Sequence, residues 1–200
     1  EAEQAVDGRR VRRDRNRDAV VDALLQLHFE GNLLPSTDEI AARAGLSPRS
    51  LFRYFDDLDD LVQTAITRQL ERVGHLFPIH ASPSAPFEVR IAAVVVHRAE
   101  LFEAIDPAAR VTRLRAPFQG VVAAHLTKTR SSLRKQLSTL FAVELAQMEP
   151  SVASARLAAA DVISSFDGWR LLRDDQRLSR ARAELALSEA LVALLQPAQP

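Results

Sequence analysis

The chain has 200 residues, 47% of them hydrophobic and 6% aromatic, and its 26 basic side chains balance its 26 acidic ones. This composition excludes an intrinsically disordered chain, and the length accommodates one or two domains with a hydrophobic core. The absence of cysteine excludes disulfides and cysteine-based zinc or redox chemistry, and it favours a reducing, cytoplasmic location.

The sequence has no segment with the length and hydropathy of a membrane-spanning helix. Apolar runs such as Ile91–Val96 are far shorter than the roughly 20 residues that cross a bilayer. The first residues are polar and arginine-rich and lack the apolar stretch of a signal peptide. We therefore expect no membrane partner.

The first charged feature along the chain is a basic arm. Six arginines, among them Arg12 and Arg13, lie between Arg9 and Arg17, against the single acid Asp14. A local excess of positive charge on a neutral protein indicates an anion-binding segment. The alternative is a solvated, partly disordered tail, and the charge pattern alone leaves both interpretations open.

A first helix is predicted over about Asp14–Phe29, where apolar residues recur at helical spacing. Gly31 is placed to end this helix. Pro35 prevents the helix from continuing, so a short connector follows.

Two short helices are predicted within residues 36–55. Ser36 and Glu39 form a capping box at the start of the first helix, and Gly45 ends it. Ser47 is the N-cap of the second, with a proline at the first helical position. Two short capped helices joined by a glycine-containing turn are typical of a helix-turn-helix. The alternative is an ordinary helical hairpin with two good caps.

The residue types of this segment fit DNA binding. The hydroxyls of Thr37, Ser47 and Ser50 can donate to phosphate oxygens, and Arg49 and Arg53 can reach guanine edges or phosphates. The upstream basic arm supports this interpretation, because arms beside such domains often enter the minor groove.

Downstream, the sequence predicts one loop and six further helices. Residues 56–77 form a helix whose aspartates complement its positive N-terminal end. Proline and serine mark residues 78–86 as a loop. The other helices are expected at about Phe87–Phe102, Pro107–Leu114, Phe118–Met148, Ser151–Arg173 and Ser179–Leu195.

Residues 20–66, VVDALLQLHFEGNLLPSTDEIAARAGLSPRSLFRYFDDLDDLVQTAI, resemble the DNA-binding domain of the TetR family of transcriptional regulators. The resemblance implies an all-α chain of about nine helices. An N-terminal basic arm and three-helix helix-turn-helix domain, residues 1–57, precedes a larger helical effector-binding and dimerisation domain, residues 58–200. The positions that carry the resemblance are Phe29, Gly31, Thr37, Ile40, Ala41, Ala44, Gly45, Ser47, Leu51, Phe52, Phe55 and Leu61.

Transferred to this sequence, the resemblance implies DNA contacts from Thr37, Ser47, Arg49, Ser50, Phe52, Arg53 and Tyr54, to which the arm adds Arg12 and Arg13. Three positions depart from the family pattern. Phe52 replaces a usual tyrosine, Tyr54 replaces a common histidine, and Leu58 replaces a frequent lysine beside four aspartates. We expect the arm, Arg49 and Arg53 to carry more of the electrostatic attraction to DNA here.

The last two predicted helices suit the two-fold interface that the resemblance implies. The final helix carries two apolar stripes, which indicates burial on two sides, and the helix before it is rich in alanine. The alternative is the core of a monomer. The expected homodimer contacts are Ala158, Val162, Leu187, Leu191 and Leu194.

An effector would bind among the helices between the fourth and the eighth. Few inward-facing charges were evident, which favours a neutral or apolar small molecule, while ordinary core packing is the alternative for every candidate side chain. The candidate lining residues are His97, Phe102, Phe118, His125, Phe141, Met148, Phe166 and Trp169.

The motifs of common enzymes are missing from the sequence, and we expect neither catalysis, nor a cofactor, nor a metal. His97 and Glu100 are three residues apart, but di-metal bundles need two Glu-x-x-His pairs. The favoured function is a sequence-specific repressor, released from a palindromic operator by an effector. The alternative is a helical protein-interaction module with a vestigial helix-turn-helix, motivated by the acidic run at residues 56–60.

Overall fold

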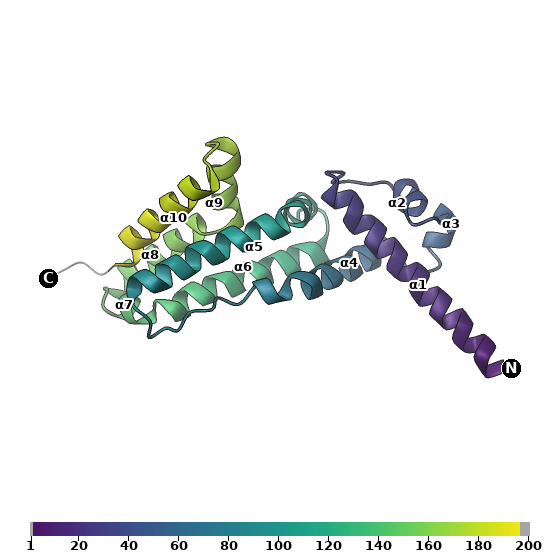
Figure 1. Cartoon of the computed structure of the whole chain (residues 1–200), viewed down its shortest axis with the longest axis horizontal. Coiled ribbons are helices and arrows are strands. Elements are labelled where there is room, and N and C mark those ends of the chain that lie inside the picture. The colour runs from purple at the N-terminus through teal and green to yellow at the C-terminus, as the bar shows by residue number, and fades with distance from the viewer. Residues whose placement is uncertain (1, 197–200) are drawn as a thin grey trace. The chain divides into compact units, whose positions relative to one another are not determined.

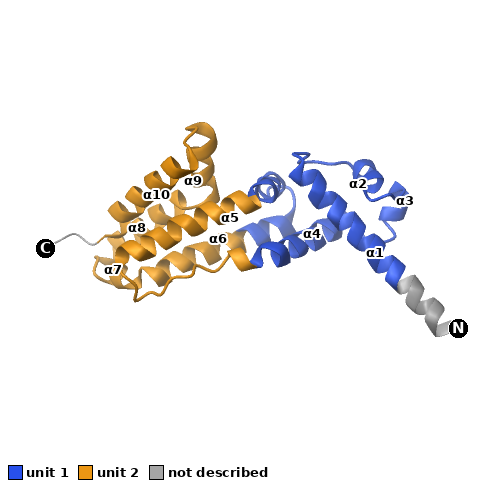
Figure 2. Ribbon diagram, in the orientation of Figure 1, with its two compact units in different colours: residues 1–74, 106–126 blue, residues 75–105, 127–200 orange. Residues whose placement is uncertain are grey.

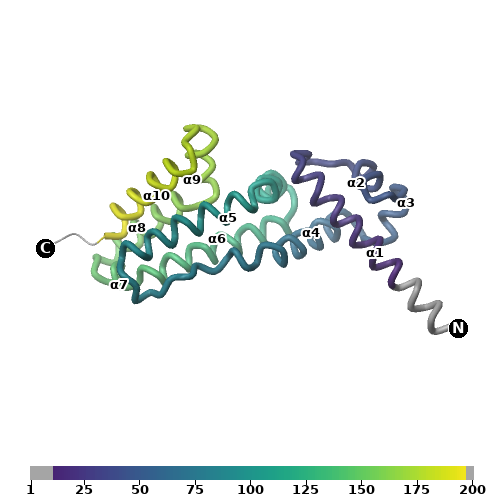
Figure 3. The backbone as a smooth tube through the Cα atoms, viewed as in Figure 1, coloured from purple at the N-terminus to yellow at the C-terminus, as the bar shows by residue number. Residues whose placement is uncertain are grey.

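The computed structural model describes the backbone of residues 2–196 and the side chains of residues 11–196. Within this part of the chain there are α-helices, one 3₁₀ turn (Gly74–Leu76) and one π turn (Leu171–Asp175), and no strand (Figures 1 and 3). The helices are α1 (Ala2–Phe29), α2 (Thr37–Arg43), α3 (Pro48–Leu51), α4 (Leu58–Val73), α5 (Phe87–Arg115), α6 (Gly120–Leu140), α7 (Ala142–Ala146), α8 (Pro150–Ile163), α9 (Phe166–Arg170) and α10 (Arg180–Leu195).

The chain divides into two compact units, coloured separately in Figure 2. The first unit contains Glu1–Gly74 and Asp106–Leu126, and the second contains His75–Ile105 and Thr127–Pro200. This division differs from a boundary at residue 57, because α4 packs on α1 and belongs to the first unit. The sequence segment 106–126 also joins the first unit, although it lies far along the chain.

Local sequence explains how the first two helices end. Gly31, at φ +89°, donates its N–H to the carbonyl of His28, and the next residue donates to Leu27. Gly45, at φ +69°, donates its N–H to the carbonyl of Ala42, and the next residue donates to Ala41. This is the Schellman arrangement, and the left-handed backbone it requires favours glycine at both positions. The prediction that these glycines end the two helices is confirmed.

The start of α2 also follows the sequence prediction. Ser36 Oγ accepts from the backbone N–H of Glu39 at 3.2 Å, and a Glu39 carboxylate oxygen accepts from the backbone N–H of Ser36 at 2.8 Å. Both bonds of the capping box are therefore present.

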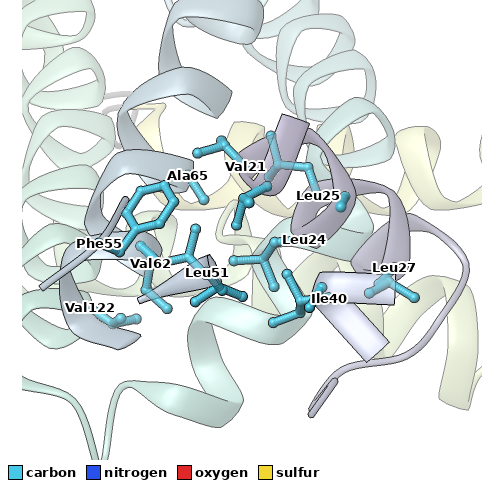
Figure 4. Packing of buried hydrophobic residues seen from close by; sticks show 14 residues of the cluster. Val21, Leu24, Leu25, Leu27, Ile40, Leu51, Phe55, Val62, Ala65 and Val122 are labelled. Atoms are coloured by element: carbon cyan, nitrogen blue, oxygen red, sulfur yellow. The ribbon is translucent and has the colours of Figure 1, made fainter. Parts of the chain in front are cut away.

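The first unit has a continuous apolar core, shown in Figure 4. Helices α1 to α4 meet there, and Val122 of α6 is part of the same cluster. The side chains with no exposed area are Val20, Val21, Leu24, Ile40, Ala41, Leu51 and Leu61. This core fixes the turn between α2 and α3, so the residues on its outer face are held in place.

The second unit is built on α5, α6, α8 and α10, with α8 and α10 packed against each other. Phe141 is buried and meets Phe87 edge to face, with ring centroids 5.8 Å apart. The other members of this core include Val94, Leu137, Ala160, Leu187 and Leu191. No helix in the described part of the chain is long and apolar enough to cross a membrane.

Several predicted helix boundaries were wrong. The first helix starts at Ala2 rather than Asp14, so the backbone of the basic arm is helical, and not a tail. The predicted break between Phe102 and Pro107 is absent, because α5 runs through Pro107. A proline there lacks the N–H that would bond the carbonyl four residues earlier, but the rest of the long helix tolerates this local loss.

Two predicted long helices are instead interrupted. The helix expected over Phe118–Met148 is divided into α6 and α7 at Phe141, whose φ of −112° lies outside the helical range. The helix expected over Ser151–Arg173 ends at Ile163, and Ser165 caps α9 by accepting from the Gly168 N–H at 3.1 Å. Helical periodicity continues across both breaks, so it did not reveal them.

Candidate nucleic-acid interface

The two short helices present a polar outer face. Ser47, Arg49 and Arg53 are exposed, while Thr37 and Ser50 are half-buried. Ser47 Oγ accepts from the backbone N–H of Ser50 at 3.3 Å and lies 2.9 Å from the Ser50 hydroxyl oxygen. These bonds fix both hydroxyl groups at the beginning of α3, where they can meet a phosphate oxygen.

The arginines of the first unit fall into two groups. Arg43 pairs with Glu30 at 2.7 Å, and Arg68 and Arg72 pair with aspartates of α1. Others are exposed and have no carboxylate partner among the residues whose side chains the structure describes: Arg12, Arg13, Arg15, Arg49 and Arg53. No described side chain neutralises the charges of this second group, so they can bind phosphates or base edges.

Tyr54 is held by α1. The Asn16 side-chain amide donates to the Tyr54 hydroxyl oxygen at 2.8 Å, which leaves the phenolic O–H free to donate to a phosphate. Phe52 is 52% exposed and offers an apolar ring at the same face. Asn16 was not predicted, because an asparagine in the middle of a helical pattern looks like any solvated residue.

The acidic run after α3 is largely committed to contacts within the first unit. Asp57 caps α4 by accepting from the Asp60 N–H at 2.8 Å. Asp60 lies 3.6 Å from Arg17, and Asp59 accepts from the Gln119 side-chain amide at 3.1 Å. The α4 N-terminus and Arg17 therefore offset much of the negative charge that the sequence placed beside the DNA-binding segment.

The basic arm continues α1 as a helix. Arg12 and Arg13 are exposed on it, whereas the side chains of Arg9 and Arg10 lie outside the described residues. Arg17 is the exception within the arm, because its guanidinium lies 5.0 Å from the centre of the Phe55 ring and donates to Thr64 at 3.1 Å. Arg17 therefore anchors the arm to α4.

A buried polar cluster completes the first unit. His28, in the last turn of α1, is 6% exposed, and its Nε2 has no hydrogen-bond partner. Arg115 is 7% exposed with an unpartnered Nε. Burial, and then the charge of Arg115, lowers the pKa of His28 from 6.5 to about 4. His28 is therefore neutral at pH 7.

The predicted dimer contacts occupy two different environments. Leu187 and Leu191 are 1% and 0% exposed and lie in the core of the second unit, so they have no free surface for a second copy. Ala158 and Leu194 are half-buried, and Val162 is 69% exposed. Apolar surface on α8 and α10 comes instead from side chains such as Val152, Val162 and Leu185.

The predicted effector residues do not form one group. Phe118 and His125 belong to the first unit, and Phe118 is 85% exposed, which does not suit the lining of an enclosed pocket. The other six lie in the second unit, where His97 and Met148 are half-buried and four aromatic side chains are buried: Phe102, Phe141, Phe166 and Trp169. Phe102 meets Phe166 edge to face at 5.7 Å.

Charge does point inward in the second unit, contrary to the sequence prediction. Arg90, Arg98 and Glu144 are 5%, 1% and 8% exposed. Helical periodicity missed them because it treats every charged residue as facing solvent. The Nε2 atom of His97 lies 2.8 Å from the Phe77 carbonyl oxygen. Among the described residues, no cluster of histidine, aspartate and glutamate side chains could hold a metal ion.

The two short helices are capped and joined by a tight glycine turn, and their outer face carries hydroxyls and exposed arginines. This arrangement is typical of a helix-turn-helix. Residues 21–65 match the family model for bacterial regulatory proteins of the tetR family. This segment is therefore similar to the DNA-binding part of TetR-family transcriptional regulators.

Solved structures share this fold. A TetR-family transcriptional regulator from Streptomyces coelicolor has a TM-score of 0.66 at 20% identity, covering 89% of this chain and 81% of that one. A TetR transcription regulator from Haloarcula marismortui ATCC 43049 has a TM-score of 0.62 at 21% identity, covering 90% and 98%. The multidrug binding protein EbrR, complexed with imidazole, has a TM-score of 0.57 at 20% identity, covering 94% and 97%. No curated protein sequence matches the chain.

Proposed function

We propose that this protein is a repressor that binds a palindromic operator as a homodimer and is released by a small-molecule effector. The observation that carries the DNA-binding part is the exposed, unpaired state of Arg49 and Arg53 next to the fixed hydroxyls of Ser47 and Ser50. Positive side chains with no acid partner in the described part of the chain attract the DNA backbone, and their N–H donors remain available for base edges.

A two-fold dimer suits this function, since it would present two recognition helices about 34–36 Å apart, one turn of DNA. The exposed apolar side chains Val162 and Leu185, at 69% and 61%, are surface that a second copy would cover. The likeness in fold to a multidrug binding protein solved with imidazole supports a small-molecule site in the second unit. An effector would act by binding the DNA-incompetent form more tightly.

The experiment starts with selection of bound fragments from random duplex DNA, followed by affinity measurements on the winning sequence at several salt concentrations. Arg53→Ala is expected to weaken operator binding about tenfold or more and to make the salt slope shallower by about one per lost phosphate contact. Arg43→Ala is the matched control, because Arg43 belongs to the same helix-turn-helix but is paired with Glu30. Equal affinities for the wild-type protein and Arg53→Ala would refute this assignment.

The alternative is a protein-interaction module with a vestigial helix-turn-helix. It was motivated by the aspartates after α3, and their contacts with Arg17, Gln119 and the α4 N-terminus argue against it. An absence of enriched sequences in the selection, together with weak binding that does not depend on salt, would favour this alternative.

A further inference from the structure

Two arginines of α5, Arg90 and Arg98, are buried in the second unit, and their hydrogen-bond partners differ in charge. Arg90 is 5% exposed and faces Glu144, with Nη1 donating to Oε2 at 2.8 Å and Nη2 donating to Oε1. It also donates to the carbonyls of Leu140 at 2.7 Å and Ala85 at 2.8 Å. Arg90 thus has a carboxylate partner and acceptors for four of its five N–H groups, as a buried charge requires.

Arg98 is more deeply buried, at 1% exposure, and has only neutral acceptors. Its Nη1 donates to Gln136 Oε1 at 2.9 Å and to His97 Nδ1 at 3.2 Å, and its Nη2 donates to the Leu133 carbonyl at 3.0 Å. In the described part of the chain no carboxylate lies within ion-pair distance of Arg98. Asp161, which acts on it electrostatically, is paired with Arg134 at 3.4 Å.

The guanidinium therefore has unused donors. Of its five N–H groups, three donate in the bonds above, and Nε has no partner at all. Burial lowers the pKa of Arg98 to about 10, so the group remains charged at neutral pH. The result is a buried positive charge with free N–H groups and, among the described residues, no carboxylate in direct contact with it.

The neighbours of Arg98 are held neutral. The Phe77 carbonyl can only accept, so His97 Nε2, at 2.8 Å, carries the proton and leaves a lone pair on Nδ1 for Arg98. The Gln136 amide also donates to Phe77, at 2.6 Å, which turns its oxygen toward Arg98. This network orients the guanidinium without neutralising it.

An aromatic pair adjoins this charge along α5. Phe102 lies four residues after Arg98, one helical turn along the same face, and meets Phe166 edge to face at 5.7 Å. A buried cation followed by aromatic rings matches a molecule with an anionic end and an apolar body.

We propose that Arg98 binds the carboxylate of an aromatic or otherwise apolar carboxylic acid, and that such an acid is the effector of this protein. This rests on the proposed function, in which an effector binds the second unit. It replaces the sequence-based expectation of a neutral effector. Because Arg98 is only 1% exposed, the acid reaches it only when this unit opens locally, so association should be slower than diffusion allows.

Benzoate and octanoate are the probes, each compared with its amide, benzamide or octanamide, which has the same shape and no charge. Calorimetric titration of the DNA-free protein is expected to show each carboxylate binding about tenfold or more tightly than its amide, as charged hydrogen bonds imply. Arg98→Gln should abolish this preference. Arg90→Lys should retain it, because Arg90 already has Glu144 as its partner.

If Arg98→Gln fails to fold, the comparison of carboxylate with amide binding to the wild-type protein still tests the proposal. The proposal is overturned if neither carboxylate binds more tightly than its amide, or if folded Arg98→Gln binds them as the wild type does. The same probes are then added to the operator complex. Carboxylate binding that leaves operator affinity unchanged supports the Arg98 site and rejects effector release, whereas operator binding without carboxylate binding rejects the Arg98 site alone.

Discussion

His28 should make the stability of the first unit depend on pH. In the folded chain the pKa of His28 is lowered from 6.5 to about 4 by burial and by the charge of Arg115. The C-terminal end of α1 would favour a protonated histidine, but burial outweighs this effect. The perturbation that tests the reasoning is His28→Gln, which removes the titrating group and keeps a polar side chain of similar reach.

The sign follows from which state binds the proton first. As the pH falls below 6.5 the unfolded chain takes up a proton at His28, and the folded chain does so only near pH 4. Stability present above pH 6.5 is therefore lost as the pH falls toward 4. A pKa difference of 6.5 minus about 4 corresponds to about 3 kcal/mol in full, of which about 2 kcal/mol is lost by pH 5.

The assay is denaturant unfolding of the wild type and of His28→Gln at pH 7 and at pH 5. The wild type should lose about 2 kcal/mol more than the variant over this interval. The pKa of His97 is lowered as well, first by burial, but its contribution is the same in both proteins and cancels. Equal losses in the two proteins, or an NMR titration of His28 centred near 6.5, would refute the reasoning.

Two further substitutions test local features of the fold. Ser36→Ala removes the capping box of α2 and should lower the free energy of unfolding by about 1 kcal/mol, measured by chemical denaturation, while no change would mean that the cap is not needed. Gly168→Ala would place a Cβ 2.5 Å from the Ile163 carbonyl oxygen and should destabilise the protein by about 1–3 kcal/mol. Gly120→Ala, which meets nothing within 4 Å, is its control, and equal stabilities of the two alanine variants would contradict the predicted clash.

Local chemistry explains what could be predicted from the sequence. Ser36, Glu39, Gly45 and Ser47 act on residues within five positions of themselves, so their capping and turn-forming roles were visible without any tertiary information. The exposed state of Arg53 also followed from its place outside the apolar face of the helix pair.

Long-range contacts explain what could not be predicted. The pairing of Asn16 with Tyr54 spans 38 positions and has no sequence signature. The burial of Arg98 depends on acceptors supplied by α6, and a helical pattern gives no hint that a charged residue will find them. The sequence predicts a helix start at Pro107 because proline disrupts a helix locally, but α5 continues through this residue, and the contacts of a long helix can outweigh that cost.

The membership of residues 106–126 in the first unit limits how this protein can be dissected. Val122 lies in the same apolar cluster as Leu24 and Phe55, and Gln119 bonds Asp59. A fragment ending at Gly74 would expose part of that cluster to solvent. Helices α2 and α3 therefore cannot be separated from the rest of the chain by a single cut without losing part of their core. Any chimera that exchanges DNA specificity has to transplant two separate stretches of sequence together.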